Sequence, residues 1–312
     1  MAQAQALNTP DKRELAVLAE RVRYGRRQVS NRVFAALMFV LTMISVALLF
    51  IIVATIITHA IPVLFPQVDG LTTFNIAFFT QTPPGDLSST EGGYAQAIVG
   101  SLEIVVVSAL VAVPLGLGTA IYLAEYGYGR FAEGVRFVLG LMAGLPSIVI
   151  GIVVWAALVR FVFQAYNGWA GAIALMLIMI PIIAISVESI LKLVPSTLRE
   201  AGLALGMPRW RVILRIVLPT VGGGVTTGVM LALARALGET APLLLTDLGN
   251  NFFNFDLTQP VGALPLQVYN DAIQAYPAAN GKSWVGVLVL VLVVAVVSAA
   301  VRYVTRKSRY ES

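Results

Sequence analysis

The chain has 312 residues, of which 58 % are hydrophobic and 12 % are charged, and its formal net charge is +5 at pH 7. A soluble domain carries about twice that charged fraction, so the composition excludes an ordinary soluble protein and favours an integral membrane protein. The sequence contains no cysteine, which excludes both a disulfide framework and a thiol-ligated metal site.

Six apolar runs, each roughly 20 residues or longer, stand between polar segments and predict helices that cross a membrane. We expect these spans at residues 34–61, 98–124, 135–163, 170–191, 219–245 and 284–304. The sequence therefore predicts an all-α membrane protein whose transmembrane domain covers residues 33–304. Residues 305–312 follow as a short cytoplasmic tail.

The segment 1–32 is charged along most of its length and only mildly periodic at the spacing of a helix. It lacks the early apolar stretch of a signal peptide. Two interpretations remain open for it. It is either a cytoplasmic amphipathic segment that lies near the membrane or a loosely ordered leader.

Lysine and arginine are concentrated in every second connecting segment. Of the 21 basic residues, 18 lie in segments 1–32, 125–136, 192–218 and 302–309, whereas segments 62–97, 164–169 and 246–283 carry only Lys282. The positive-inside rule then predicts that both termini face the cytoplasm. The net positive charge reflects this orientation and attraction to anionic lipids, and it does not indicate a nucleic-acid partner.

Isolated polar residues within the spans have simple expected roles. His59, at the outer end of the first span, is expected to be a wetted side chain, because a metal site needs several converging ligands. Glu103 either lines an entrance or is a water-reached carboxylate near the outer face. Glu188 is expected to pair with Lys192, which follows it by four residues on a helix.

Proline and glycine mark bends and close contacts in the later spans. Pro146 and Pro181 are expected to kink their helices, because proline lacks the backbone N–H and crowds the preceding turn. The run 222–224 and Gly228 allow neighbouring helices to approach closely. They also allow the inner half of the fifth span to flex.

The basic segment 192–218 predicts a helix, a turn and a second helix. Ser196 is the expected N-cap of the first helix, and Gly206 followed by Pro208 is expected to end it. The second helix runs from Arg209 into the fifth span. We therefore expect a short helix held below the membrane, where it can contact a soluble partner.

This segment resembles the EAA loop of bacterial ABC-importer permeases, which couples the permease to its ATPase. The matching residues are Glu200-Ala201-Gly202, then Gly206, then Ile216 and Leu218-Pro219, and only the glycine at 202 departs from the family pattern. The resemblance implies that the ATPase contacts are made by Glu200, Ala201, Gly202, Gly206 and Arg209. The chain has no phosphate-binding loop for ATP, so we expect ATP and magnesium to be bound by the partner ATPase and no cofactor in this chain.

Arg235 and Glu239 lie in the apolar run "ALARALGETAPLLL". An ionised side chain in mid-span costs roughly 2.5–3.5 kcal/mol, and about 24 Å of helix separates Arg235 from the start of its span. Two interpretations are open: an ion pair that fixes helix packing, or a guanidinium on the path of an anion that Glu239 partly neutralises. Arginine suits phosphate or sulfate, because its planar fork donates two parallel hydrogen bonds.

Four stretches together resemble the PstA-type permease of the bacterial phosphate-specific ABC transport system. They are residues 100–127, 143–151, 192–206 and 232–244, of which "ARALGETAPLL" is the most specific. The resemblance implies the six-span type I ABC-importer permease fold. It also implies that the chain is not itself an enzyme and that Arg235 and Glu239 take part in phosphate passage.

The partners that this resemblance implies are a homologous permease of the PstC type, a dimer of ATPase subunits and an extracytoplasmic phosphate-binding protein. The expected location is the cytoplasmic membrane. Two alternatives stay open. The same machine carries another oxyanion or small solute, or the chain is a non-transporting membrane scaffold or passive channel.

Overall fold

The computed structural model describes residues 12–68 and 71–308, and these fall into two compact units, Met1–Thr55 and Ile56–Ser312. Most of the first unit is the helix α1 (Lys12–Leu64). The most apolar 18-residue window of its part from Asn31 onwards has a mean hydropathy of 2.9, and no residue of that window is buried within the chain. Residues 1–11 of the expected amphipathic segment lie outside the described residues.

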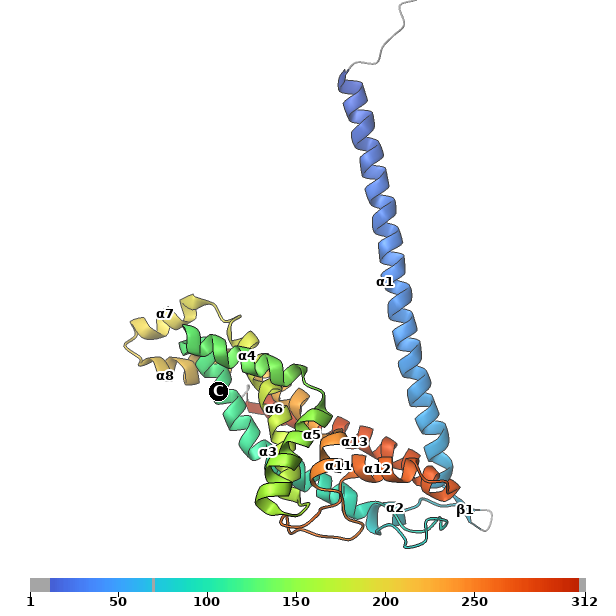
Figure 1. The fold of residues 1–312 in the computed structure, drawn as a ribbon. Coiled ribbons are helices and arrows are strands. Elements are labelled where there is room, and N and C mark those ends of the chain that lie inside the picture. The colour runs from blue at the N-terminus through green and yellow to red at the C-terminus, as the bar shows by residue number, and fades with distance from the viewer. Residues whose placement is uncertain (1–11, 69–70, 309–312) are drawn as a thin grey trace, which may run out of the picture. The chain divides into compact units, whose positions relative to one another are not determined.

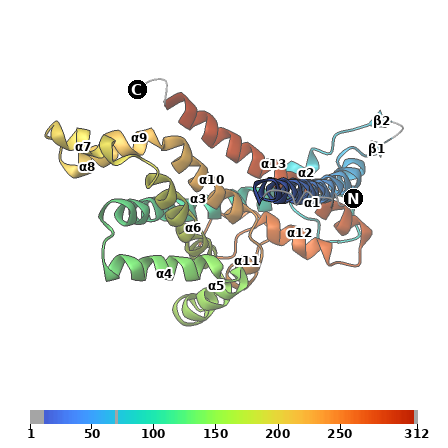
Figure 2. The same ribbon diagram turned by 90° about the horizontal axis from the view of Figure 1, so that it is seen from above.

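The second unit consists of helices, the loops that connect them and a two-stranded antiparallel hairpin, β1 (Gln67–Val68) and β2 (Leu71–Thr72). Its first half contains α2 (Ala77–Thr80), α3 (Ala95–Ile121) with the π-type turn η1 (Tyr122–Tyr126), α4 (Arg130–Gly144), α5 (Ser147–Val154) with η2 (Trp155–Phe163), and α6 (Gly168–Leu191). Its second half contains α7 (Ser196–Ala204), α8 (Arg209–Val212), η3 (Ile213–Val217), α9 (Leu218–Thr220), α10 (Gly222–Leu237), α11 (Ala241–Thr246), α12 (Leu264–Ala272) and α13 (Pro277–Ser308). Figures 1 and 2 show this order.

The described residues contain four unbroken helices long and apolar enough to span a membrane, and six spans if each of two bent helix pairs counts as one. The prediction of six spans holds in that sense. The kink expected at Pro146 in the third span is confirmed, and it is a full break of the helix, because α4 and α5 meet at 105°. Pro146 lacks an N–H and excludes the helical conformation at Leu145, which is extended (φ −70°, ψ 138°).

The expected fifth span, residues 219–245, is also not one helix. A 79° bend at Val221 separates the stretch Arg209–Thr220 from α10, and α10 itself ends at Leu237 before α11 begins. Glycines follow the bend at once and proline opens α11, so both breaks fall where the sequence weakens a helix. In contrast, α6 continues as one helix through Pro181.

The centre of the second unit is α6, which packs against α3, α4, α5, α10 and α11. Of its most apolar stretch 61 % is buried, compared with 33 % for α3 and 22 % for α13. Asn167 is the N-cap of α6, and its side chain accepts a hydrogen bond from the Ala170 N–H at 2.8 Å. The expected close approach is confirmed at Gly224 and Gly228, where a Cβ would lie 2.8 Å from Ile190 and 3.1 Å from Ser186 of α6, but not at Gly222, where a Cβ would meet nothing within 4 Å.

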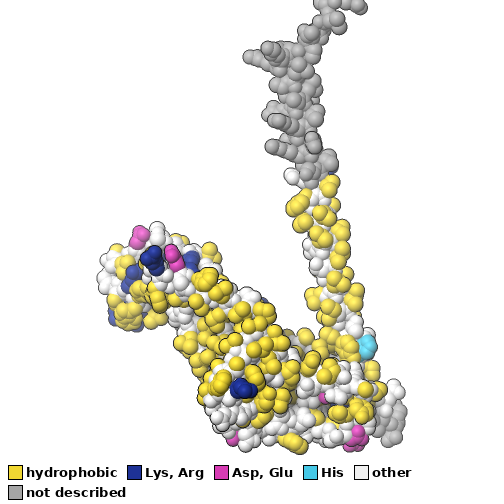
Figure 3. All heavy atoms as spheres, viewed as in Figure 1, with side chains coloured by type: hydrophobic (Ala, Val, Ile, Leu, Met, Phe, Trp, Pro, Cys, Tyr) yellow, Lys and Arg dark blue, Asp and Glu magenta, His cyan; other side chains and the backbone are white. Residues whose placement is uncertain are grey.

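Charge is distributed unevenly over the second unit. Figure 3 shows acidic and basic side chains gathered over the end that carries α7 and α8, whereas hydrophobic side chains cover the middle. This is the pattern expected of a protein whose apolar band contacts lipid and whose charged end contacts water.

Candidate functional site

Arg235 and Glu239 form the ion pair that their spacing predicts. The Nε of Arg235 donates to Oε1 of Glu239 at 3.1 Å. Glu239 lies beyond the end of α10, because the helix stops at Leu237 and Gly238 forms its C-cap. The pair is therefore made between the last turn of a helix and the turn that follows, and not along one continuous span.

The two side chains differ in exposure. The Arg235 side chain is 52 % exposed and that of Glu239 is 11 % exposed. Among the described residues, the only hydrogen bond of the guanidinium is the one from Nε, so both terminal nitrogens remain available as donors. Arg235 therefore carries a charge that is partly neutralised and still open to a further acceptor.

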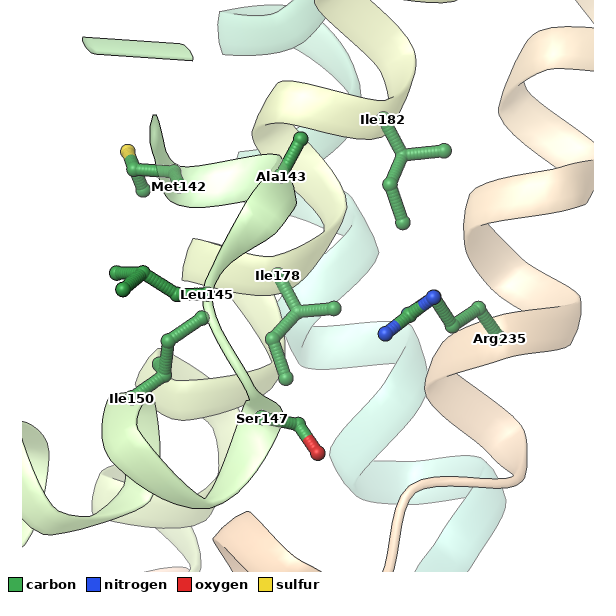
Figure 4. A pocket seen from close by; sticks show the side chains of 8 residues that line it. All are labelled: Met142, Ala143, Leu145, Ser147, Ile150, Ile178, Ile182 and Arg235. Carbon is green, nitrogen blue, oxygen red and sulfur yellow. The ribbon is translucent and has the colours of Figure 1, made fainter. Parts of the chain in front are cut away.

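The guanidinium points from α10 towards the bend between α4 and α5 (Figure 4). It lines a cavity of about 30 Å³ together with Met142, Ala143, Leu145, Ser147, Ile150, Ile178 and Ile182. A cavity of this size holds one or two water molecules. The cavity covers only part of the guanidinium, because the Arg235 side chain is half exposed and can also be reached from outside it.

Two larger cavities lie elsewhere in the second unit. One, of about 420 Å³, is formed by α3, α10 and α13 and is lined by Leu102, Val105, Val106, Ala109, Leu110, Val113, Pro114, Leu233, Leu237 and Val297. The other, of about 310 Å³, is lined in part by the amides of Asn250, Asn251, Gln267 and Asn270. Neither has a charged side chain among its described lining residues, so Arg235 marks the better candidate for an anion.

The expected coupling segment forms two helical arms joined by a sharp turn. Gly206 has φ +77°, a conformation that residues with a Cβ rarely adopt. Glu200 and Ala201 are exposed, and Leu205 beside the turn is 82 % exposed. The expected cap is wrong, because Pro195 occupies the N-cap position and Ser196 is already the first helical residue.

Gly202 faces inward and fixes how the two arms pack. A Cβ at this position would lie 2.8 Å from the Cδ1 of Ile216 and 2.9 Å from the Cγ2 of Val212. The glycine that departs from the family pattern therefore lies at the closest contact between the arms. Glu200 and Ala201, the other two residues of the motif, are on the exposed side.

Arg209 contacts the chain itself. Its Nη2 donates to the backbone carbonyl of Glu125, and its guanidinium lies 4.9 Å from the centre of the Tyr126 ring. The Glu125 side chain binds Arg199 of α7, with a shortest N–O distance of 2.6 Å. The sequence analysis did not identify this pair, and the only local signal was an acidic residue at the end of the second span.

A second ion cluster lies at the same end. The expected pair of Glu188 with Lys192 is confirmed, with Nζ and Oε1 2.7 Å apart. Arg136 of α4 also binds Glu188 at 2.7 Å and donates to the Leu123 carbonyl at 2.8 Å. This contact was not predicted, because Arg136 and Glu188 are 52 residues apart.

Several charged groups are buried at the end of the second unit that lies away from α7 and α8. Lys282, which is 4 % exposed, donates to the carbonyls of Ser89 and Glu91 at 3.0 and 3.2 Å. Burial raises the pKa of Asp271, which accepts a hydrogen bond from the Tyr94 hydroxyl. Burial also raises the pKa of Asp247 to about 7. The loops at this end therefore carry buried as well as exposed carboxylates.

Comparison with known proteins gives consistent results. Residues 112–310 match the family model described as binding-protein-dependent transport system inner membrane component. The chain is 40 % identical to the phosphate transport system permease protein PstA of Yersinia pestis over 77 % of this chain and 81 % of that protein. It is 37 % identical to the PstA of Haemophilus influenzae over 88 % of this chain and 93 % of that protein.

Solved structures share the fold at low sequence identity. The MetNI methionine ABC transporter in an inward-facing conformation matches with a TM-score of 0.55 and 18 % identity, over 68 % of this chain and 94 % of that chain. A bacterial ABC transporter involved in the import of alginate matches with a TM-score of 0.53 and 14 % identity, over 68 % and 78 % of the respective chains. These likenesses support the type I ABC-importer permease architecture.

Proposed function

Because the chain belongs to the family of binding-protein-dependent transport system inner membrane components, we propose that it carries inorganic phosphate across the cytoplasmic membrane as one permease subunit of an ATP-driven importer. The chain is a multi-pass membrane permease and not an enzyme, and a partner ATPase drives transport. The substrate is inferred from the similar permeases, whose names assign them to phosphate transport, and from the chemistry of Arg235.

The observation that carries the proposal is the half-exposed guanidinium of Arg235 with both terminal nitrogens available. Two parallel N–H donors match two oxygens of an oxyanion, and the positive charge strengthens both hydrogen bonds. Glu239 holds the guanidinium through Nε and reduces its net charge. An anion is therefore attracted strongly enough to enter and weakly enough to leave.

The narrow space in front of Arg235 suits a gated path. The cavity beside the guanidinium has room for one or two waters, and we propose that it widens for the anion when α10 moves away from the α4–α5 bend. We assign Glu200, Ala201, Gly202, Gly206 and Arg209 to the coupling segment through which a dimer of ATPase subunits drives this movement. A homologous permease of the PstC type completes the path, and an extracytoplasmic binding protein delivers the anion to the outer loops.

We also propose that both termini and the α7–α8 end face the cytoplasm, because the basic residues collect there. The absence of native cysteine allows a direct test with single cysteines at exposed positions, Tyr128→Cys near α4 and Phe252→Cys in the 246–263 loop. A membrane-impermeant maleimide added to intact spheroplasts should label Phe252→Cys at once and Tyr128→Cys only after permeabilisation. The opposite pattern would overturn the orientation.

The test of the function is phosphate uptake in a strain that lacks this chain. Radiolabelled phosphate uptake should be restored by the wild-type gene, and excess sulfate should not compete. Uptake of another labelled anion with no uptake of phosphate would favour the alternative of a different oxyanion. A chain that restores no uptake and does not co-purify with an ATPase would favour a scaffold or passive channel.

A further inference from the structure

Three arginines from three separate helices converge on the short turn η1 that continues α3. Arg136 of α4 donates to the Leu123 carbonyl at 2.8 Å. Arg199 of α7 binds the Glu125 side chain, and Arg209 of α8 donates to the Glu125 backbone carbonyl. The cytoplasmic end of α3 is therefore held by both arms of the coupling segment.

The contact between Arg199 and Glu125 is extensive and enclosed. The Nε of Arg199 lies 3.0 Å from each carboxylate oxygen, and its Nη2 lies 2.6 Å from Oε1. Glu125 is 3 % exposed. Charge-assisted hydrogen bonds with this fork geometry fix direction as well as distance, so the pair holds α7 against η1 in a defined orientation.

Arg199 also reaches the end of α6. Its Nη1 donates to the Val194 carbonyl at 2.6 Å and its Nη2 to the Leu191 carbonyl at 3.0 Å. Leu191 is the last residue of α6, where helix carbonyls have no partner within the helix. One side chain therefore joins the coupling segment to both α3 and α6, the two most closely packed spans of the unit.

The coupling segment itself is stiff enough to move as one body. Gly202 packs against Val212 and Ile216 of the other arm, and the Met207 N–H donates to the Gly202 carbonyl at 3.2 Å across the turn. Arg209 adds its contacts with Glu125 and Tyr126 from the second arm. A force on the exposed face that carries Glu200 is thus passed to η1 with little internal yielding.

We propose that Glu125 and Arg199 are positioning residues that transmit the displacement of the coupling segment to α3 during transport, an inference that rests on the proposed function. Arg199 precedes Glu200 in the chain, so adjacent residues of α7 face η1 and the surface assigned to the ATPase. The segment begins 66 residues beyond the end of η1 in sequence, so its connection to α3 is made through space, by the ion pair and by the contacts of Arg209. Without the pair, the segment follows the ATPase while only the contacts of Arg209 still draw α3 with it.

The test uses the whole transporter in proteoliposomes, with its ATPase and binding protein, and measures phosphate uptake and ATP hydrolysis in the same vesicles. Glu125→Gln and Arg199→Gln should each co-purify with the ATPase and hydrolyse ATP. The phosphate taken up per ATP should fall about tenfold or more in both. Arg199→Lys, which keeps the charge without the fork, should fall between these variants and the wild type.

The matched control is Arg130→Gln, which removes an exposed arginine from the first residue of α4. It should keep the wild-type ratio of uptake to hydrolysis. An unchanged ratio in Glu125→Gln and Arg199→Gln, or an equal loss in Arg130→Gln, would overturn the inference. If a glutamine variant fails to assemble, Arg199→Lys decides, because an unchanged ratio in it would also contradict the proposal.

These results separate the inference from the function on which it rests. Failure of the wild-type vesicles to take up phosphate would refute the proposed function. Normal uptake by the wild type together with normal coupling in the variants would refute only the role of Glu125 and Arg199.

Discussion

Replacing Arg235 by glutamine should impair phosphate uptake without unfolding the protein. The side chain is 52 % exposed, and its described ion pair is a single 3.1 Å contact with Glu239. Exposed ion pairs of this kind contribute roughly 0.2–1 kcal/mol to stability. Glutamine can still approach Glu239 as a neutral donor, so assembly with the partner subunits should be close to that of the wild type.

The effect on transport should be much larger than the effect on folding. Hydrogen bonds to charged groups contribute about 1.5–3 kcal/mol each, and roughly 1.4 kcal/mol corresponds to a factor of ten in rate. Loss of the charged donor to the passing anion should therefore lower the uptake rate about 10- to 150-fold. Arg235→Lys keeps the charge but not the paired donors, so its uptake rate should lie between those of the wild type and Arg235→Gln.

The assay is initial-rate uptake of radiolabelled phosphate in a strain lacking the native chain, normalised to the amount of assembled complex. Arg160→Gln is the matched control, because Arg160 is an exposed arginine in η2 that does not line the cavity at Arg235. Uptake within threefold of wild type in assembled Arg235→Gln would refute the role of this guanidinium in the anion path. The pair would then be assigned to helix packing.

Three further predictions concern the coupling segment and the outer loops. Glu200→Lys reverses the charge of an exposed residue, so the chain should fold but lose co-purification with the ATPase in a pulldown; retained co-purification would contradict the assignment. Gly206→Pro replaces φ +77° by about −65° and removes the N–H that donates to Leu203 at 2.9 Å. This substitution should destabilise the turn by more than about 1 kcal/mol. Limited proteolysis should then cut the α7–α8 segment faster than in the wild type. An unchanged rate of cleavage would show that the turn tolerates proline. The pKa of Asp247 is raised to about 7 by burial, so its contribution to stability is fully present below about pH 4 and is lost as the pH rises through about 7. Thermal unfolding in detergent should show Asp247→Asn to be less sensitive to pH than the wild type over this window, and parallel curves would refute the assignment.

The sequence by itself indicated the membrane class, the positions of up to six spans and the two helical arms of residues 192–218 with their turn. Each of these depends on local properties: a run of apolar side chains has no favourable place but lipid or a protein core, and glycine at 206 permits the turn whatever surrounds it. The spacing of Arg235 and Glu239 likewise indicated their contact, because residues four apart along the chain lie within reach of one another in helical backbone.

Only the tertiary structure decided how the helices bend and which distant charges meet. Pro146 predicts a kink, but the 105° angle depends on how α5 packs against α11, where a Cβ at Gly151 would lie 2.8 Å from Pro242. Glu125 and Arg199 are 74 residues apart, and no local pattern selects one arginine over another as the partner of a carboxylate. Helix packing makes that choice, because the ion pair forms only when the end of α3 and the start of α7 are brought side by side and shielded from water.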